Sequence, residues 1–411
     1  MNSKWVVSHC GSRDSYQLPL AIAEADALCC FVTDWLRTPN PLKFDGTKGE
    51  RRRPQQPVRP RLKELRVSML ASLVLRPPRR DQFLQDRLGE VAAAQANAYG
   101  CNVLTTSYYG WSTLPRVRSA GQRGLFQIHP EPTVLRRRYT ELSRTDARYM
   151  ALGKELELAA DSNSASTRGW FSEWHNASVL IAASNYTKRT LVQAGCDGVK
   201  IHVVPYGVDS EVFRPIKLAP LDEFTVLFVG SRIARKGIFT LLDAWERLRL
   251  PHAHLVFVGR GRSDLGGCQA LPERTEERGA ITRHELVHLL NQVDLLAVPS
   301  IAEGFGHVYL ESLAVGCPVV GSTHSALPDI ITEGREGFCV EPGDLNALCD
   351  RLLWCHKNRD KLREMRSAAR ERALLYSWAN FRAGVRNALG IPPSSAPSGQ
   401  NALSYVNRTT H

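Results

Sequence analysis

The sequence predicts an α/β protein built from two domains, each with a parallel sheet. Short apolar runs alternate with amphipathic segments along most of the chain, which is the pattern of strands and helices in βαβ units. The alternation pauses between residues 213 and 222 and then restarts. The length of 411 residues exceeds what one core usually supports, and a hydrophobic content of 43% is ample for two.

The first half opens with a strand, a loop, a helix and a second strand. Residues 4–10 (KWVVSHC) and 27–33 (ALCCFVT) are the apolar runs, and residues 19–25 (PLAIAEA) form the helix between them. The loop that carries Gly11 follows the first strand, so it faces the sheet edge where open α/β sheets bind ligands. The pattern continues in residues 92–100, 101–107, 123–132, 178–184 and 200–209.

The second half repeats the alternation from residue 224 onwards. We expect strands within residues 224–229, 253–258, 295–300, 316–320 and 337–341, with helices within 240–248, 284–293 and 308–314 and a long basic helix after residue 344. From residue 391 the sequence is rich in proline and serine, which predicts a disordered tail.

Composition limits the compartment and the partners. The ten cysteines form no CxxC pair and mostly sit in apolar runs, which indicates buried thiols in a reducing compartment. We find no signal peptide and no apolar run near twenty residues, so we expect a cytoplasmic protein without a membrane span. The net charge of +12 suggests a polyanionic partner. Because no zinc finger, RNP signature or helix-turn-helix accompanies that charge, nucleic acid is not the expected one.

The basic residues concentrate between Lys48 and Arg80. Within this segment we expect a helix over residues 62–75, with four apolar side chains on one face: Leu62, Leu65, Met69 and Leu73. A basic amphipathic helix can lie on an anionic membrane surface, which would place the protein at the inner face of the membrane. The alternative is an arginine-rich loop followed by a helix that packs in the protein's own core.

The loop of residues 230–237 (GSRIARKG) follows an apolar strand and precedes a helix. Its backbone amides and the side chains of Ser231, Arg232 and Lys236 form a candidate site for an anion, and a diphosphate suits it. The alternative is a solvated lysine after a glycine turn. No GxxxxGK[ST] sequence is present, so a P-loop NTPase is not supported.

Residues 303–320 (EGFGHVYLESLAVGCPVV) form a second candidate site. Gly304 and Gly306 let the backbone approach a ligand ahead of a helix. Glu311 can accept two hydrogen bonds from a ribose diol, and Glu303 can accept them from sugar hydroxyls. The alternative for Glu311 is a surface helix glutamate, and for His307 we favour a structural or solvent-facing role over a catalytic one.

Taken together, these motifs resemble those of the retaining nucleotide-sugar glycosyltransferases of family GT4, which have the GT-B fold. Residues 303–321 resemble the E-x7-E signature of that family. Further segments match it in the same order: residues 8–22, 175–195, 200–209, 228–237, 343–353 and 376–381. The resemblance runs from Trp5 to Gly390.

The resemblance implies two Rossmann-like, doubly wound parallel-sheet domains that face a central cleft. Residues 1–212 would form the acceptor-side domain, 213–222 the linker and 223–376 the nucleotide-sugar-binding domain. Residues 377–390 would form a helix that crosses back to the first domain, ahead of the tail at 391–411.

The resemblance also assigns roles to residues of the second half. Glu311 matches the glutamate that holds the nucleotide ribose, and Lys236 the lysine that neutralises the diphosphate. Glu303 matches the residue that contacts donor-sugar hydroxyls. The loop along the sugar and diphosphate is matched by Phe305, Gly306 and His307. Family members usually carry an arginine at the position of Ser231, and here Arg232 follows one residue late.

Two residues of the first half complete the predicted site. His129 resembles the histidine that points at the donor sugar, so His129 and Glu303 are the expected catalytic residues. Gly11 resembles the glycine whose loop lets the acceptor and the diphosphate come close. The cations near the diphosphate would stabilise the leaving group without a metal, and no cofactor is expected.

The implied activity is that of a retaining, metal-independent hexosyltransferase of polysaccharide or glycolipid biosynthesis. It would move a hexosyl group from a nucleotide sugar to a hydroxyl of a glycan, a glycolipid or a small metabolite. UDP, GDP and ADP sugars remain open, with UDP or GDP favoured by their frequency in the family. The alternatives are a non-catalytic nucleotide-sugar-binding subunit and a GT-B sugar-nucleotide epimerase.

Overall fold

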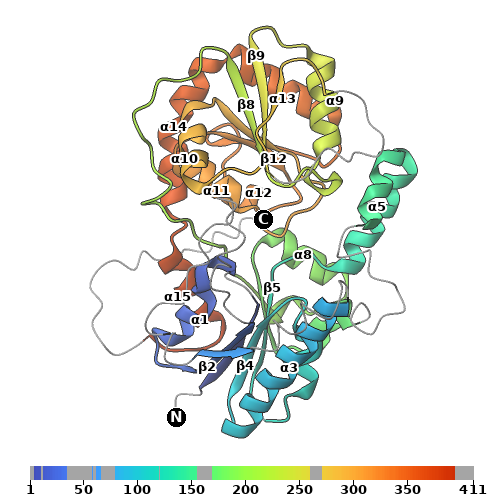
Figure 1. Ribbon diagram of the computed structural model, residues 1–411, viewed down its shortest axis with the longest axis vertical. Coiled ribbons are helices and arrows are strands. Elements are labelled where there is room, and N and C mark those ends of the chain that lie inside the picture. The colour runs from blue at the N-terminus through green and yellow to red at the C-terminus, as the bar shows by residue number, and fades with distance from the viewer. Residues whose placement is uncertain are drawn as a thin grey trace, which may run out of the picture.

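The computed structural model of the chain contains two parallel sheets, one in each half, with helices packed around them (Figure 1). It describes residues 4–10, 13–34, 58, 62–65, 79–119, 121–154, 169–259 and 271–393. The predicted role of Gly11 and the predicted tail from residue 394 onwards lie outside these residues.

The first sheet has seven parallel strands in the described part of the chain, in the order β3-β2-β1-β4-β5-β6-β7. They are β1 (Trp5–Ser8), β2 (Leu28–Asp34), β3 (Leu62–Leu65), β4 (Asn102–Thr106), β5 (Arg123–Gln127), β6 (Val179–Ala182) and β7 (Ile201–Val203). The helices of this half are α1 (Gln17–Ala23), α3 (Arg79–Tyr99), α4 (Gly110–Thr113), α5 (Pro132–Thr145) and α8 (Asn185–Gln193). Strands β1 and β4 are buried along their whole length, which explains their apolar sequences.

The second sheet has six parallel strands within the described residues, in the order β10-β9-β8-β11-β12-β13. They are β8 (Phe224–Val229), β9 (Ala253–Val258), β10 (Thr275–Glu277), β11 (Leu295–Val298), β12 (Val319–Ser322) and β13 (Gly337–Val340). Its helices are α9 (Ile238–Leu248), α10 (Arg283–Gln292), α11 (His307–Ala314), α12 (Leu327–Ile330), α13 (Leu345–Lys357) and α14 (Arg359–Leu374).

The strand order of each sheet reverses at one point, and ligands of open α/β sheets bind outside such points. In the second sheet the reversal lies between β8 and β11. The predicted loop of residues 230–237 follows β8, and the predicted segment of residues 303–320 begins in the loop after β11. In the first sheet the reversal lies between β1 and β4, so the loops after Ser8 and Thr106 open there.

The helix expected over residues 62–75 is wrong at its start. Residues 62–65 form the edge strand β3, which pairs in parallel with β2 through Phe31 opposite Leu62 and Asp34 opposite Leu65. Two leucines three residues apart fit a helix, but four residues are too few to separate the two periods. Pairing satisfies the hydrogen-bonding groups along the edge of β2. Residues 66–75, and most of the basic segment, lie outside the described residues.

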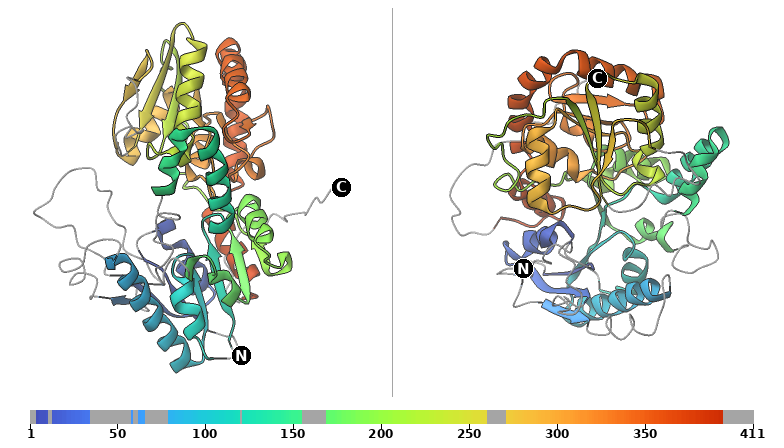
Figure 2. Two further views of the ribbon diagram at one scale, coloured as in Figure 1. Left: turned by 90° about the vertical axis from the view of Figure 1, so that its right-hand side faces the viewer. Right: turned by 45° about the horizontal axis from the view of Figure 1, so that its top comes forward.

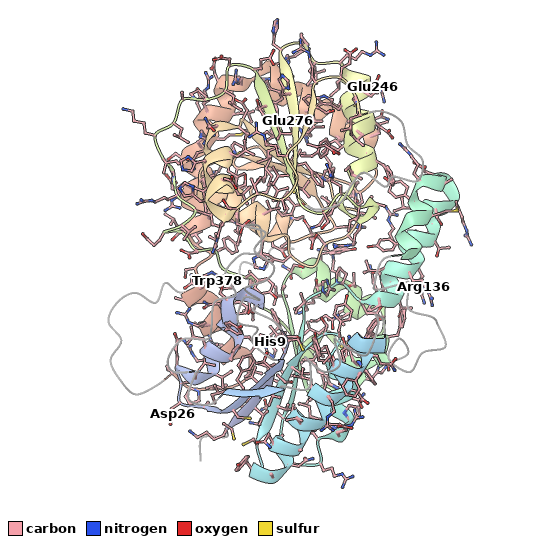
Figure 3. All side chains as sticks on the ribbon, viewed as in Figure 1. His9, Asp26, Arg136, Glu246, Glu276 and Trp378 are labelled. Carbon is pink, nitrogen blue, oxygen red and sulfur yellow. The ribbon has the colours of Figure 1, made fainter. Side chains whose placement is uncertain are left out.

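The last helix, α15 (Trp378–Ala388), leaves the second half and packs against α1 of the first. Trp378 lies at the junction of the two halves (Figure 3). Arg382 and Arg386 both donate hydrogen bonds to the carboxylate of Glu24, at 2.9 and 3.0 Å. The two sheets are therefore tied together by the C-terminal helix as well as by the linker.

A second connection runs along one side of the molecule, where α5 rises toward α9 (Figure 2). Arg148, just after α5, forms a bidentate ion pair with Asp243 of α9 at 2.6 and 2.7 Å, and also pairs with Asp146 at 2.7 Å. The hydroxyl of Tyr149 lies 3.0 Å from that of Thr240. This contact joins the first half to the helix that follows the loop of residues 230–237.

The described residues include no helix long and apolar enough to cross a membrane. Nine cysteines lie among them, all as free thiols, and five of these are buried.

Candidate active site between the two domains

The loop before α11 is shaped by two glycines. Gly306 has a φ of 91°, and a Cβ added there would lie 2.5 Å from the ring of Tyr309. At Gly304 an added Cβ would lie 1.8 Å from the carbonyl oxygen of Ile128 and 3.2 Å from the Cα of His129. Because only glycine permits such a close approach, the loop of the second domain rests directly on the first-domain backbone beside His129.

Helix α8 of the first domain holds the same loop. The hydroxyl of Ser184, which caps α8, donates a hydrogen bond to the Gly304 carbonyl at 2.6 Å, and the hydroxyl of Thr187 donates to it at 3.2 Å. Nearby, the backbone N–H of Asn185 donates to Asp329 at 2.7 Å. The first domain therefore fixes the backbone next to the residue that precedes Gly304, which is Glu303.

Glu303 forms a compact charged cluster with two cations of the other candidate loop. Its carboxylate pairs with the ammonium of Lys236 and with the guanidinium of Arg235 at 3.2 Å, and only 14% of its side chain is exposed. Burial raises the pKa of Glu303, but the charges of Lys236 and Arg235, with a further contribution from His129, bring it down to about 2. The structure therefore brings together three predicted residues, His129, Glu303 and Lys236, with the carboxylate ionised.

The loop of residues 230–237 reaches Glu303 through a 3-10 turn, Ala234–Lys236. Gly237 ends the turn with a φ of 73°, and a Cβ there would lie 1.8 Å from the carbonyl oxygen of Pro299. The backbone N–H of Ile301 also donates to the Arg235 carbonyl at 2.7 Å. The turn is thus packed against the end of β11, which directs both Arg235 and Lys236 toward Glu303.

Arg232 points elsewhere. Its guanidinium pairs with Glu277 of β10 at 2.5 Å, and only 7% of its side chain is exposed. Ser231 is exposed at the end of β8. The structure does not bring Arg232 to Glu303, and instead places Arg235, which the sequence analysis missed, beside Lys236. The signal for Arg235 was its position next to Lys236 in a basic loop.

Glu311 lies half-buried on α11, on the same helix as His307. Burial raises the pKa of its carboxyl to about 7, and the charge of Arg283 opposes that rise. Arg283 starts α10, and its guanidinium lies 4.8 Å from the ring centroid of Phe213. A carboxyl with this pKa changes its hydrogen-bonding capacity near neutral pH, because only the ionised form accepts with both oxygens.

The two rings of the loop have different environments. Phe305 is buried, with 3% exposure, and its ring packs edge-on against Tyr206 at a centroid distance of 5.3 Å. Its side chain therefore supports the loop from within. His307 is exposed at the start of α11, with its ring 4.4 Å from that of Tyr206.

Two residues of the first domain that the sequence analysis did not select also lie at this site. Tyr108 follows β4, and its ring centroid is 5.0 Å from that of His129. The buried carboxyl group of Glu173 accepts a hydrogen bond from the Tyr108 backbone N–H at 3.0 Å. These two residues are 65 positions apart, so no local pattern in the sequence connects them.

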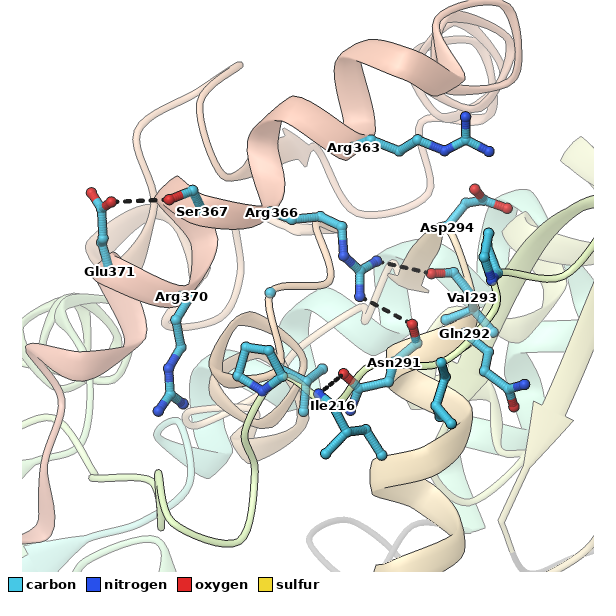
Figure 4. Close-up of a pocket in the computed structure, with 15 residues that line it drawn as sticks. Ile216, Asn291, Gln292, Val293, Asp294, Arg363, Arg366, Ser367, Arg370 and Glu371 are labelled. Atoms are coloured by element: carbon cyan, nitrogen blue, oxygen red, sulfur yellow. Dashed lines mark hydrogen bonds between the residues drawn. The ribbon is translucent and has the colours of Figure 1, made fainter.

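A separate cavity of about 510 Å³ lies between the linker, the end of α10 and α14 (Figure 4). The guanidinium of Arg366 donates to the carbonyls of Asn291 and Val293, and that of Arg370 donates to the carbonyl of Ala314. These carbonyls end α10 and α11, so both arginines cap helix C-termini. None of the predicted site residues lines this cavity, and we assign it a structural role.

No group of three or more His, Cys, Asp or Glu side chains suited to holding a metal ion occurs within the described ranges.

Comparison with known proteins gives a consistent result. Residues 209–372 match the family model described as glycosyl transferases group 1. The D-inositol 3-phosphate glycosyltransferase of Mycobacterium marinum is 30% identical over 238 residues, which are 52% of this chain and 50% of that protein. The protein of the same name from Mycobacterium tuberculosis (strain F11) is 31% identical over 52% of this chain and 49% of its own length. The chain thus spans about half the length of the curated relatives it matches.

Solved structures resemble almost the whole chain. Sucrose-phosphate synthase from Thermosynechococcus elongatus superposes with a TM-score of 0.67 at 20% identity, over 94% of this chain and 98% of that one. Anabaena Alr3699/HepE in complex with UDP and glucose superposes with a TM-score of 0.60 at 16% identity, over 94% and 99%. These likenesses confirm the predicted α/β class and the GT-B fold.

Proposed function

We propose that this chain is a retaining hexosyltransferase, because residues 209–372 match the family model of glycosyl transferases group 1. It moves a hexosyl group from a nucleotide-diphosphate sugar to a hydroxyl of a glycan, a glycolipid or a small metabolite. The observation that carries the proposal is the cluster of Glu303, Lys236 and Arg235 beside His129, at the point where the second sheet reverses its strand order.

The cluster fits the charge changes of sugar transfer. When the bond from the anomeric carbon to the diphosphate breaks, negative charge develops on the leaving group. Lys236 and Arg235 are held in the loop after β8 by a turn that is packed against the residues after β11. Fixed cations of this kind stabilise developing negative charge without reorganising during the reaction.

The carboxylates fit the two hydroxyl-bearing parts of the donor. Glu303 is ionised well below neutral pH, so both of its oxygens can accept hydrogen bonds from sugar hydroxyls. Glu311, on the helix that follows, accepts hydrogen bonds from the hydroxyls of the ribose. His129 and the Gly304 loop meet across the domain boundary, so sugar and acceptor would be enclosed where water is excluded.

We favour a UDP or a GDP sugar as the donor. The match to Anabaena Alr3699/HepE, whose structures hold UDP, UDP and glucose, or UDP-glucose, supports the UDP option. The peripheral membrane contact through Lys48 to Arg80 also remains our proposal. Cosedimentation with phosphatidylserine vesicles tests it, because replacing Arg51, Arg52 and Arg53 by glutamate should abolish binding; unchanged cosedimentation would refute it.

Thermal unfolding with UDP, GDP and ADP tests nucleotide binding. A nucleotide at a hundredfold excess over its dissociation constant should add about 2.7 kcal/mol of apparent stability. The wild type should respond to one nucleotide, and Glu311→Ala should lose the response. Glu364→Ala, which alters an exposed glutamate of α14, is the matched control and should respond like the wild type. If none of the three nucleotides stabilises the wild type, the proposal fails.

Turnover separates the alternatives. A transferase releases nucleoside diphosphate much faster when an acceptor is present, and NMR of the product should show the anomeric configuration of the donor. A sugar-nucleotide epimerase would instead convert the donor without an acceptor. A non-catalytic subunit would bind the nucleotide and give neither reaction across a panel of sugar and lipid acceptors.

A further inference from the structure

Tyr108 has an unusual backbone conformation at a functionally placed position. It lies two residues beyond β4, at the point where the first sheet reverses its strand order. Its φ is 74°, in the left-handed region that residues with a bulky side chain rarely adopt. Such conformations persist only where the surrounding structure enforces them, and they gather at functional sites.

The carboxyl group of Glu173 stabilises this conformation. Glu173 is buried, with 2% exposure, and its Oε1 accepts a hydrogen bond from the Tyr108 N–H at 3.0 Å. Burial raises the pKa of Glu173 to about 8, and the backbone N–H groups of Tyr108, Trp111 and Gly110 oppose that rise. A Cβ added at Gly110 would lie 3.0 Å from the other carboxylate oxygen. A glycine at this position therefore leaves room for the carboxyl group beneath the turn.

The enforced backbone directs the Tyr108 ring between two other rings. On one side its centroid lies 5.2 Å from that of Trp170, in an edge-on arrangement. The indole N–H of Trp170 donates to Gln85 at 3.2 Å, and the indole N–H of Trp111 donates to the same oxygen at 3.2 Å. On the other side the centroid of the Tyr108 ring lies 5.0 Å from that of the His129 imidazole, and the two ring planes are tilted by 45°.

The backbone of His129 is fixed independently of Tyr108. Its carbonyl accepts a hydrogen bond from the side-chain amide of Gln127 at 2.9 Å, and the Gly304 loop packs against its Cα. The orientation of the imidazole depends on the groups that lie against this side chain, and the charge of Glu303 is among those that interact with it. The ring of Tyr108 is the aromatic group that the described structure places against that side chain.

We propose that Tyr108 is a positioning residue that sets the orientation of the His129 imidazole for sugar transfer, and that Glu173 holds Tyr108 in place. This inference rests on the proposed function, in which His129 faces the donor sugar. It assigns a role in the reaction to a side chain outside the family-matched residues 209–372. Since misplacing a reacting group by about 1 Å can cost about 10²-fold in rate, the effect should appear in kcat.

The kinetic test compares Tyr108→Leu, Tyr108→Phe and Tyr109→Leu. Tyr108→Leu removes the ring and should lower kcat about 10²-fold, with KM for the donor changed less than about twofold. Tyr108→Phe retains the ring and should recover most of kcat. Tyr109→Leu, which alters the next half-buried tyrosine, is the control for loss of packing. If Tyr108→Leu lowers kcat no more than Tyr109→Leu does, the proposal is wrong.

A double-mutant cycle shows whether Tyr108 acts through His129. In a His129→Ala background, Tyr108→Leu should have almost no further effect on kcat, because the group that it positions is already absent. Independent, multiplicative losses would overturn the proposal.

A readout that needs no turnover separates this inference from the proposed function. The His129 ring protons can be assigned in the NMR spectrum by their loss in His129→Ala. They should shift in Tyr108→Leu and move little in Tyr109→Leu. If the resonances shift but the protein has no transferase activity, the proposed function is rejected, whereas the contact between Tyr108 and His129 is supported. Unshifted resonances would reject the positioning role even in an active enzyme.

Discussion

The two halves of the candidate site are built from different chemistry. The second domain contributes charge, with Glu303 paired to Lys236 and Arg235. The first domain contributes rings, with His129 against Tyr108 and Tyr108 against Trp170. Even the buried carboxyl group of the first half, that of Glu173, is directed at backbone N–H groups.

This difference indicates a division of labour. A fixed set of cations suits the diphosphate, a group that UDP, GDP and ADP sugars share. Packed aromatic rings present a defined surface with little charge, so they suit the task of orienting a reacting group. Substitutions in the second half should therefore act through charge, and those in the first half through geometry.

The largest effect is expected on the charged side. Lys236→Ala removes a fixed cation at the leaving group, and kcat should fall about 10²-fold to 10³-fold, as when one preorganised donor is deleted elsewhere. Steady-state kinetics measures it, with Lys357→Ala, an exposed lysine at the end of α13, as the control. Lys236→Arg should retain part of the rate because it keeps the charge. A loss of less than tenfold in Lys236→Ala would mean that Lys236 serves only to neutralise Glu303.

A pH titration separates the two carboxylates of the charged side. The pKa of Glu311 is raised to about 7, so the carboxyl is protonated below neutrality and ionised above it. If the ionised form binds the ribose, the dissociation constant for the nucleotide should fall roughly tenfold between pH 6 and pH 8. Glu303, with a pKa lowered to about 2, stays ionised throughout and contributes no change in this range.

Isothermal titration calorimetry at several pH values measures this effect. Glu311→Gln removes the titrating group and preserves its shape, so its affinity should vary only with the ionisation of the nucleotide phosphate. If the pH profile of the wild type is identical to that of Glu311→Gln, nucleotide binding does not depend on the ionised carboxylate of Glu311.

The same division explains which parts of the site the sequence could predict. In the second domain, Lys236, Glu303 and Glu311 lie in two loop-to-helix segments that follow adjacent strands. Strand and helix periodicity therefore located them without knowledge of distant contacts. Arg235 was missed because the 3-10 turn decides which of the basic side chains reaches Glu303, and the packing that stabilises this turn comes from the end of β11.

In the first domain the site depends on contacts between distant residues. Tyr108 becomes significant only through Glu173, 65 positions later, and through the ring of His129. The strand β3 was predicted as a helix for a related reason, since its partner β2 lies nearly thirty residues earlier. The periodicity of a segment indicates which of its own side chains are buried. It does not indicate which residues from distant parts of the sequence will contact that segment.

The smallest effect is expected where the two halves are joined at the surface. Arg148 pairs with Asp243 of the second domain and Asp146 of the first, and about a third of its side chain is exposed. Exposed ion pairs contribute up to about 1 kcal/mol, so Arg148→Ala should lower kcat/KM by no more than about fivefold. Arg144→Ala, at an exposed position of α5, is the control for loss of a charge on the same surface.

Salt provides the decisive comparison for Arg148. The pair is screened at high ionic strength, so the difference between wild type and Arg148→Ala should shrink in 0.5 M NaCl, whereas the loss caused by the buried Lys236→Ala should persist. If Arg148→Ala equals the wild type even at low salt, the contact of Gly304 with Ile128 and the C-terminal helix suffices to hold the rings of one half against the charges of the other.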